Sequence, residues 1–438
     1  MANRKRTYYP LIKSELFRNI SILISGTALA QLIPILLQPI LRRYYTPETF
    51  GAYTVYLSLL GILIVISSLK YELAIILPKK EKEAANVLFL AILLNLLMNG
   101  LILLIIIIWN SRIAGFLNLN NVFAKYLYAV PLGTFLLSFF QSINYWLIRK
   151  KRFFTISKNK FIRRGIEGGS QVGFKFVHLF HGLILGDIAG HFANISYGIF
   201  QAVKNGLKPS FFSFIKLKYV FKKYQEYPKF NVIPSLMSAC SYLLPAIFIN
   251  KYFSTVHAGF FDLSKLVLSI PLALIATSLS NVLLQRISEK YRTGESFILD
   301  LVPVFWVVLI IAVLEITVIR IWGVKLFLIF FGQEWEDSGI ISRVLVWSFT
   351  LNFFSASFSS LFISMKKIKL LSLWQLVYFL AILSLILFKD LPFKIFIRNY
   401  VIIEVSCYIL ISFLISYIIW KYERGIVIKP RPEVSEKK

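Results

Sequence analysis

The sequence is poor in the residue types from which most metal and catalytic centres are built. It has only two cysteines, Cys240 and Cys407, each inside an apolar run, so neither a disulfide framework nor a cysteine-based metal site is available. Its four histidines show no HxxxH or HExxH spacing, which argues against zinc chemistry. It also lacks a glycine-rich phosphate loop. We therefore expect neither a metal nor a cofactor.

Acidic residues are also scarce, because 21 Asp and Glu stand against 49 Lys and Arg, a formal net charge of +28. In a soluble protein this balance would favour a nucleic-acid partner. Here, however, 57% of the residues are hydrophobic, the mean hydropathy is +0.70, and the basic residues occupy short segments between long apolar runs. That pattern is typical of a multi-pass membrane protein whose basic loops set its orientation and contact anionic lipids. No nucleic-acid partner is expected.

The apolar runs predict an all-α membrane protein with twelve spanning helices. The first run follows basic residues and contains Ala28-Leu29-Ala30, like a signal peptide, but it continues to Leu41 and is too long for one. The helices are expected at about residues 15–41, 49–69, 86–109, 123–148, 161–183, 184–203, 230–250, 256–284, 299–321, 338–365, 370–388 and 395–421. Thr46, Pro47 and Glu48 supply the N-cap, first position and first-turn acid of the second helix.

Charge and repetition indicate how these helices are organised. Alternate segments between the helices, both termini included, hold 36 of the 49 Lys and Arg residues, which predicts that both termini are cytoplasmic. Residues 44–46 and Gly51 have counterparts in residues 252–254 and Gly259, at an offset of 208, as in a parallel repeat. We expect an N-terminal lobe at 1–203, a basic connecting loop at 204–229, a C-terminal lobe at 230–421 and a cytoplasmic tail at 422–438. The connecting loop could lie on the membrane surface.

The predicted fifth helix is unusually polar for a membrane span. Glu167, Gln171, Lys175 and His178 follow one another at steps of three or four and share one stripe. Ionisable groups in a membrane helix are costly and usually face protein or water. The stripe therefore predicts the lining of a polar cavity, with Lys175 near mid-helix as a partner for phosphate. The alternatives are an ion pair of Lys175 with Glu167 or Glu404, and a helix–helix contact for His178.

Other polar residues within the apolar runs are further candidates. Gln31 lies on the polar face of the first helix, where it could line the cavity or bond to a neighbouring helix. Asp262 and Lys265 are three residues apart, so they could line the cavity mouth or pair with each other. Arg343 could reach inward, whereas Arg42 is expected at the outer interface. Two deep carboxylates could couple transport to an ion gradient, namely Glu315 and Glu404.

Several segments carry a family resemblance. Residues 25–31 (SGTALAQ), 42–53 (RRYYTPETFGAY) and 70–78 (KYELAIILP) closely resemble polysaccharide flippases of the Wzx O-antigen type. The likeness returns at 182–186 (GLILG) and 258–261 (AGFF). These flippases belong to the multidrug/oligosaccharidyl-lipid/polysaccharide exporter superfamily. The resemblance implies two six-helix lobes around a central cavity, and it provides no fixed catalytic motif.

The resemblance also implies an activity. The expected substrate is an O-antigen or capsular repeat unit on undecaprenyl pyrophosphate, moved across the bacterial inner membrane by alternating access. Expected partners are this lipid-linked oligosaccharide, membrane lipids, a polysaccharide polymerase and a chain-length regulator. The protein would not be an enzyme, and an ion gradient, mass action or a partner would drive transport. Two alternatives are a drug or toxin extruder of the same superfamily and a membrane-embedded glycan polymerase or ligase.

Overall fold

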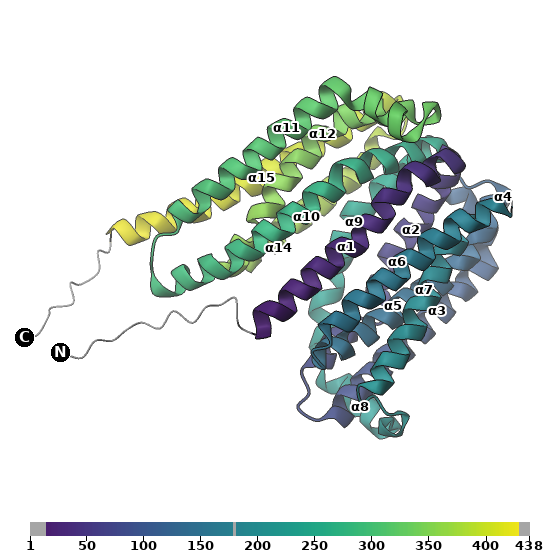
Figure 1. Cartoon of the computed structure of the whole chain (residues 1–438), viewed down its shortest axis with the longest axis vertical. Coiled ribbons are helices and arrows are strands. Elements are labelled where there is room, and N and C mark those ends of the chain that lie inside the picture. The colour runs from purple at the N-terminus through teal and green to yellow at the C-terminus, as the bar shows by residue number, and fades with distance from the viewer. Residues whose placement is uncertain (1–14, 178–180, 429–438) are drawn as a thin grey trace, which may run out of the picture. The chain divides into compact units, whose positions relative to one another are not determined.

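The computed structural model describes residues 15–177 and 181–428 (Figure 1). All regular structure within these residues is helical, and they contain no β-strand. Contacts between residues divide the chain into two units, Met1–Ala239 and Cys240–Lys438. The boundary falls inside one helix, α9 (Glu226–Tyr252).

The first unit is a bundle of long helices with short helical connections. The long helices are α1 (Glu15–Tyr44), α2 (Pro47–Ser67), α3 (Glu81–Phe116), α5 (Ala129–Arg149), α6 (Phe153–Phe176) and α7 (Gly182–Lys204). The short ones are η2 (Tyr71–Ile76), α4 (Asn121–Ala124), η3 (Lys125–Tyr128), η4 (Pro209–Phe211) and α8 (Phe214–Lys223). α6 packs against α1 and α7, while α5 packs against α2, α3 and α7.

The second unit contains α10 (Thr255–Thr293), α11 (Ile298–Phe331), α12 (Glu336–Phe358), α14 (Ile368–Leu383) and α15 (Phe393–Ile428). Its short helices are η5 (Gln333–Trp335), α13 (Ser360–Ser364) and η6 (Ser384–Phe388). α12 packs against α10, α11 and α15, and α14 packs against α15. The long helices α11, α12 and α15 run side by side (Figure 1).

The number of long helices agrees with the sequence prediction. Among the described residues, nine helical segments are long and apolar enough to cross a membrane: α2, α3, α4 to α5, α9, α10, α11, η5 to α13, α14 to η6, and α15. Together with α1, α6 and α7 they make twelve long helices. The chain is therefore a multi-pass membrane protein, and the predicted all-α fold class is confirmed.

The predicted repeat extends to a pair of helix caps. Thr46 accepts a hydrogen bond from the Thr49 N–H (3.3 Å) at the start of α2, with Pro47 at the first helical position as expected. Ser254 accepts one from the His257 N–H (3.1 Å) at the start of α10. The two caps are 208 residues apart, so the same local hydrogen bond starts the second long helix of each half.

The predicted boundary between the fifth and sixth helices is wrong. α6 begins at Phe153 and ends at Phe176, and α7 begins at Gly182. The sequence between these two helices contains no proline that would have marked the stop. Lys175 therefore lies in the last turn of its helix rather than near its middle.

A short surface helix, α8, lies within the predicted connecting loop and is held against the start of α3. Leu217 and Val220 are buried in the cluster that α3 and α5 form. Glu83 of α3 accepts hydrogen bonds from the Lys223 Nζ (2.6 Å) and the Tyr224 hydroxyl (2.9 Å). Ile215 on α8 is 84% exposed. The helix thus has one face bound to the first unit and apolar side chains on another.

Candidate functional site

α6 and α7 pack closely along glycines spaced four residues apart on α7. At Gly186, an added Cβ would stand 2.9 Å from the backbone nitrogen of Gln171. At Gly190, it would stand 2.8 Å from the Cβ of Glu167. Small residues at this spacing allow membrane helices to approach closely. Glu167 and Gln171, both predicted to line a cavity, are consequently buried where α6 meets α7.

Two arginines surround the Glu167 carboxylate. Arg164 Nη1 donates to both of its oxygens, to Oε1 at 3.0 Å and Oε2 at 2.9 Å, which are charge-assisted contacts. Arg163 Nε lies 3.7 Å from Glu167 Oε2. Because Glu167 is buried and both cations are only partly exposed, these pairs operate with little screening by water.

Arg163 also links α6 to a second buried carboxylate on α7. Its Nη2 lies 3.4 Å from Asp187 Oδ1 and 3.2 Å from His191 Nε2. The Tyr56 hydroxyl of α2 donates to Asp187 Oδ2 (3.2 Å). Asp187 is fully buried, so its charge requires these partners. The result is a polar network that joins α2, α6 and α7.

Gln171 and Lys175 lie beside this network, toward the end of α6. Gln171 Nε2 donates to the Leu183 carbonyl of α7 (3.1 Å) and to the Tyr53 hydroxyl of α2 (3.4 Å). The Tyr45 hydroxyl donates to the backbone carbonyl of Gln171 (2.7 Å). The Lys175 ammonium lies 5.6 Å from the centre of the same Tyr45 ring, within cation–π range.

The remaining candidates of the first unit lie on α1 or outside the described residues. Gln31 is a half-buried residue of α1. His178 lies outside the described residues. Arg42, expected at the outer interface, is instead 1% exposed. Its guanidinium stacks on Phe50 at 3.5 Å and its Nε donates to Gln38 (2.9 Å).

In the second unit, Glu404 of α15 is buried in an aromatic cluster. It accepts a hydrogen bond from the Tyr378 hydroxyl of α14 (2.7 Å), and that hydroxyl lies 3.3 Å from the Tyr408 hydroxyl. Trp374 stacks on Tyr378, and its indole N–H donates to the Cys407 carbonyl (2.8 Å). Tyr400 and Ser348 are further hydrogen-bond partners of this carboxylate, and the Lys265 ammonium is near enough to act on its charge.

The other second-unit candidates lie on α10, α11 and α12. The Lys265 ammonium lies 3.2 Å from the centre of the Tyr242 ring and donates to the Tyr242 carbonyl (2.7 Å). Asp262 is a half-buried residue of α10. Arg343 Nη2 donates to the Ile321 carbonyl (3.4 Å), and Glu315 accepts a hydrogen bond from Thr350 (3.1 Å). These four candidates are thus distributed over separate contacts on three helices.

Residues that complete both networks were not among the sequence candidates. They are Arg163, Asp187, His191 and Tyr56 in the first unit, and Tyr378, Tyr408 and Trp374 in the second. The glycines at 182, 186 and 190 could have predicted the first network, because their spacing indicates that another helix packs closely against α7. The aromatic cluster has no such signal, since tyrosines are frequent throughout the chain.

Comparison with known families identifies the chain. Residues 16–290, more than half of the chain, match the family described as polysaccharide biosynthesis protein. The chain belongs to this family. The match begins in α1 of this polysaccharide biosynthesis protein and ends within α10, so it covers the first-unit network completely. A comparison with curated proteins returns no match.

Solved structures show the fold that this polysaccharide biosynthesis protein shares. An inward-facing multidrug resistance MATE family transporter of the MOP superfamily has a TM-score of 0.70 and 13% identity, covering 92% of this chain and 99% of that chain. A Vibrio cholerae MATE transporter has a TM-score of 0.60 and 12% identity, over 95% and 97%. A MOP superfamily transporter from Pyrococcus furiosus, described as having a binding pocket of reverse polarity, has a TM-score of 0.58 and 16% identity, over 93% and 96%.

Proposed function

We propose that this protein is a flippase that moves an oligosaccharide linked to a polyprenyl pyrophosphate across the bacterial inner membrane. The oligosaccharide would be an O-antigen or capsular repeat unit, and transport would proceed by alternating access between two lobes. Membership of the polysaccharide biosynthesis family and a fold shared with MOP superfamily transporters support this proposal. Both termini would be cytoplasmic, as the distribution of Lys and Arg predicts.

The net positive charge of α6 is the observation that supports an anionic substrate. This helix has five cationic side chains and one carboxylate, Glu167. Glu167 is already paired with Arg164, and Asp187 of α7 with Arg163. The excess of positive charge favours an anionic headgroup such as a pyrophosphate and disfavours the cationic substrates of a drug extruder.

An enzyme of glycan polymerisation or ligation is the less favoured alternative. Such an enzyme needs an outer loop large enough to hold an acceptor. The connections on the predicted outer side are tight turns, for example between α1 and α2 and between α9 and α10. A polymerase and a chain-length regulator would therefore be separate partner proteins that act on the flipped product.

The polar candidates within the described residues have proposed roles in this cycle. Lys175, Lys265 and Arg343 would contact the pyrophosphate or sugar hydroxyls, with Gln31 and Asp262 as polar lining. Glu167 and Gln171 would hold α6 against α7 beside Lys175. Glu404, and Glu315 as the second candidate, would take up a proton and couple flipping to the gradient.

Proteoliposomes with a defined lipid-linked oligosaccharide test the proposal. We expect glycan loaded in one leaflet to become accessible to a membrane-impermeant glycosidase at the other, faster than in protein-free vesicles. A parallel assay with a fluorescent cationic drug should show no accumulation. Drug transport without glycan movement would overturn the proposal in favour of an extruder. Elongation of the glycan would instead indicate a polymerase.

A further inference from the structure

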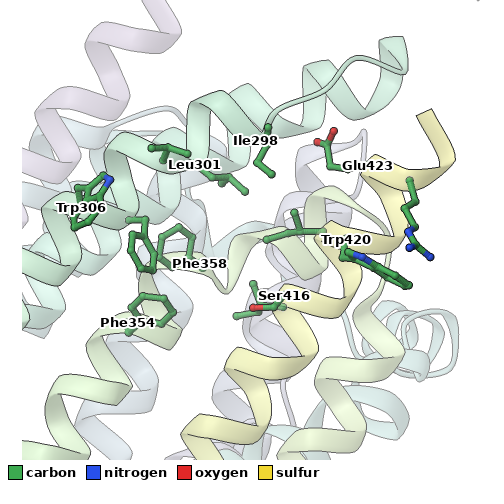
Figure 2. A pocket seen from close by; sticks show the side chains of 13 residues that line it. Ile298, Leu301, Trp306, Phe354, Phe358, Ser416, Trp420 and Glu423 are labelled. Atoms are coloured by element: carbon green, nitrogen blue, oxygen red, sulfur yellow. The ribbon is translucent and has the colours of Figure 1, made fainter. Parts of the chain in front are cut away.

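The second unit contains an apolar groove that none of the proposed transport roles uses. Its volume is about 730 Å³, and Figure 2 shows it between α11, α12 and α15. Aromatic rings form one wall, where Phe305 and Phe354 meet edge to face at 5.7 Å and Phe354 contacts Phe358. Ile415 and Ile419 of α15 also line the groove. The groove is therefore shaped by hydrocarbon and aromatic surface along membrane-spanning helices.

One end of the groove is fixed by contacts between α11 and the end of α15. Glu423 Oε1 accepts a hydrogen bond from the Phe297 N–H (3.1 Å), the residue before α11. The Tyr422 ring stacks on the Phe297 ring at 5.0 Å. These contacts hold the two helix ends together while α12 packs against both helices. The groove consequently has a defined mouth near the end of α15.

The charges at this mouth are unbalanced. The Glu423 carboxylate keeps its charge while it accepts the Phe297 N–H, and Asp300 forms ion pairs with both Arg286 (2.7 Å) and Lys290. Once Arg424 is counted, three cations therefore stand against two carboxylates at this end of the groove. Arg424 lines the mouth, and its guanidinium stacks on Trp420 at 4.3 Å. No carboxylate within residues 15–177 and 181–428 pairs with Arg424. An exposed cation thus remains where the apolar groove opens.

We infer that the groove binds one acyl chain of an anionic glycerophospholipid, whose phosphate Arg424 holds. The occupant must be amphiphilic, because the groove is apolar and its mouth is cationic. Trp306 and Trp420 line the groove, and such residues favour the headgroup region of a bilayer. The mouth also lies at the predicted cytoplasmic end, where basic residues meet anionic lipid. Phospholipid is the most concentrated amphiphile in a membrane, so mass action favours it over a rarer lipid.

Native mass spectrometry of the full-length protein in mild detergent tests this inference. Phosphatidylglycerol and phosphatidylcholine are added at equal concentrations, and the bound lipid is counted. The wild-type protein should retain one phosphatidylglycerol at least about tenfold better than phosphatidylcholine, because the trimethylammonium group of phosphatidylcholine already neutralises the phosphate that Arg424 would hold. Arg424→Gln should remove that preference, and Ser416→Trp, which fills the groove, should remove the bound lipid.

Matched control variants on the same helix separate the groove from general effects. Arg398 is an exposed arginine at the opposite end of α15, and Arg398→Gln should leave the preference unchanged. Ser406 is exposed and bonds to the carbonyl four residues earlier, as Ser416 does, so Ser406→Trp should leave retention unchanged. Arg424→Gln alters an exposed side chain, so its result stands even if Ser416→Trp does not fold.

Four outcomes would overturn the inference. Equal retention of both lipids by the wild type would show that the mouth does not select an anion. Unchanged retention in Arg424→Gln and Ser416→Trp would place the lipid elsewhere. Displacement of phosphatidylglycerol by an equimolar amount of polyprenyl phosphate would show that the groove binds a polyprenyl lipid instead. Loss of lipid with formation of a dimer would show that a second copy of the chain covers the groove.

Discussion

Gly190 of α7 and Glu167 of α6 lie so close that a methyl group on the glycine would stand 2.8 Å from the Glu167 Cβ. Gly190→Ala should therefore push the two helices apart, at a cost of about 1–3 kcal/mol in the free energy of unfolding. The measurement is thermal unfolding in detergent. Gly173→Ala on α6 is the matched control, because nothing lies within 4 Å of its added Cβ. Equal stability of both variants would contradict the close packing.

The buried pair of Arg164 and Glu167 should be strongly non-additive. Arg164→Met removes one of the two cations that pair with the buried Glu167 carboxylate, and Glu167→Met leaves the Arg164 guanidinium without this carboxylate. Each single change should therefore lower the free energy of unfolding by about 3–5 kcal/mol. The double change removes both charges and should cost less than the sum of the single changes. Equilibrium unfolding of the four proteins measures the coupling. Strict additivity would mean that the pair contributes nothing as a pair.

The role of Lys175 can be tested in cells that depend on this protein for surface polysaccharide. Lys175→Ala should abolish surface polysaccharide while the protein still inserts into the membrane, and Lys175→Arg should keep part of it. Lys158 is the matched control, because it lies on the same helix and over a tyrosine ring at a similar distance, 5.8 Å from the centre of Tyr197. Lys158→Ala should leave the polysaccharide largely intact. Normal polysaccharide in Lys175→Ala would remove this residue from the mechanism.

If Glu404 couples transport to protons, replacing it with the uncharged glutamine should make the rate of flipping independent of the proton gradient. Glu404→Gln preserves shape and can still accept the hydrogen bond from Tyr378, so the fold should persist. Flipping in proteoliposomes should then no longer respond to an imposed pH difference, although movement down a substrate gradient continues. Glu315→Gln is measured in parallel to decide between the two carboxylates. An unaltered response in Glu404→Gln would exclude Glu404 from coupling.

The contact between Glu83 and α8 should control how firmly this helix is held. Burial, assisted by the hydrogen bond to Glu83, raises the pKa of Tyr224 to about 12, so Tyr224 remains a donor at physiological pH. Glu83→Gln weakens two charge-assisted hydrogen bonds and should speed amide exchange in residues 214–223 by about tenfold. Glu81→Gln is the control, because Glu81 pairs with Lys150 instead. Equal exchange in the two variants would contradict this role.

Hydropathy predicted the helices well, and it failed where a tertiary contact decides the outcome. The sequence between α6 and α7 contains no proline, so the periodic pattern continued to Leu183 and placed Lys175 at mid-helix. Arg42 near a helix end was expected to reach the interface. It is buried instead because Phe50, eight positions later in the chain, supplies a ring for its guanidinium.

The candidate networks were only partly predictable for a related reason. Glu167 and Gln171 are recognisable as polar residues on an apolar helix. Their partners Asp187 and Tyr56 depend on which helices become neighbours, and one sequence does not contain that information. The close approach of α6 to α7, by contrast, is indicated in the sequence by the regularly spaced glycines of α7.

The scarcity of cysteine has a practical consequence once the surroundings of Cys407 are known. Its backbone carbonyl is bonded by Trp374 of α14 and the residue is 6% exposed, whereas Cys240 is only half-buried. A maleimide should therefore label Cys240 before it labels Cys407. The rate at which Cys407 is labelled, relative to Cys240, thus reports how often its surroundings become accessible. It can be read by mass spectrometry in a native bilayer, with no introduced probe.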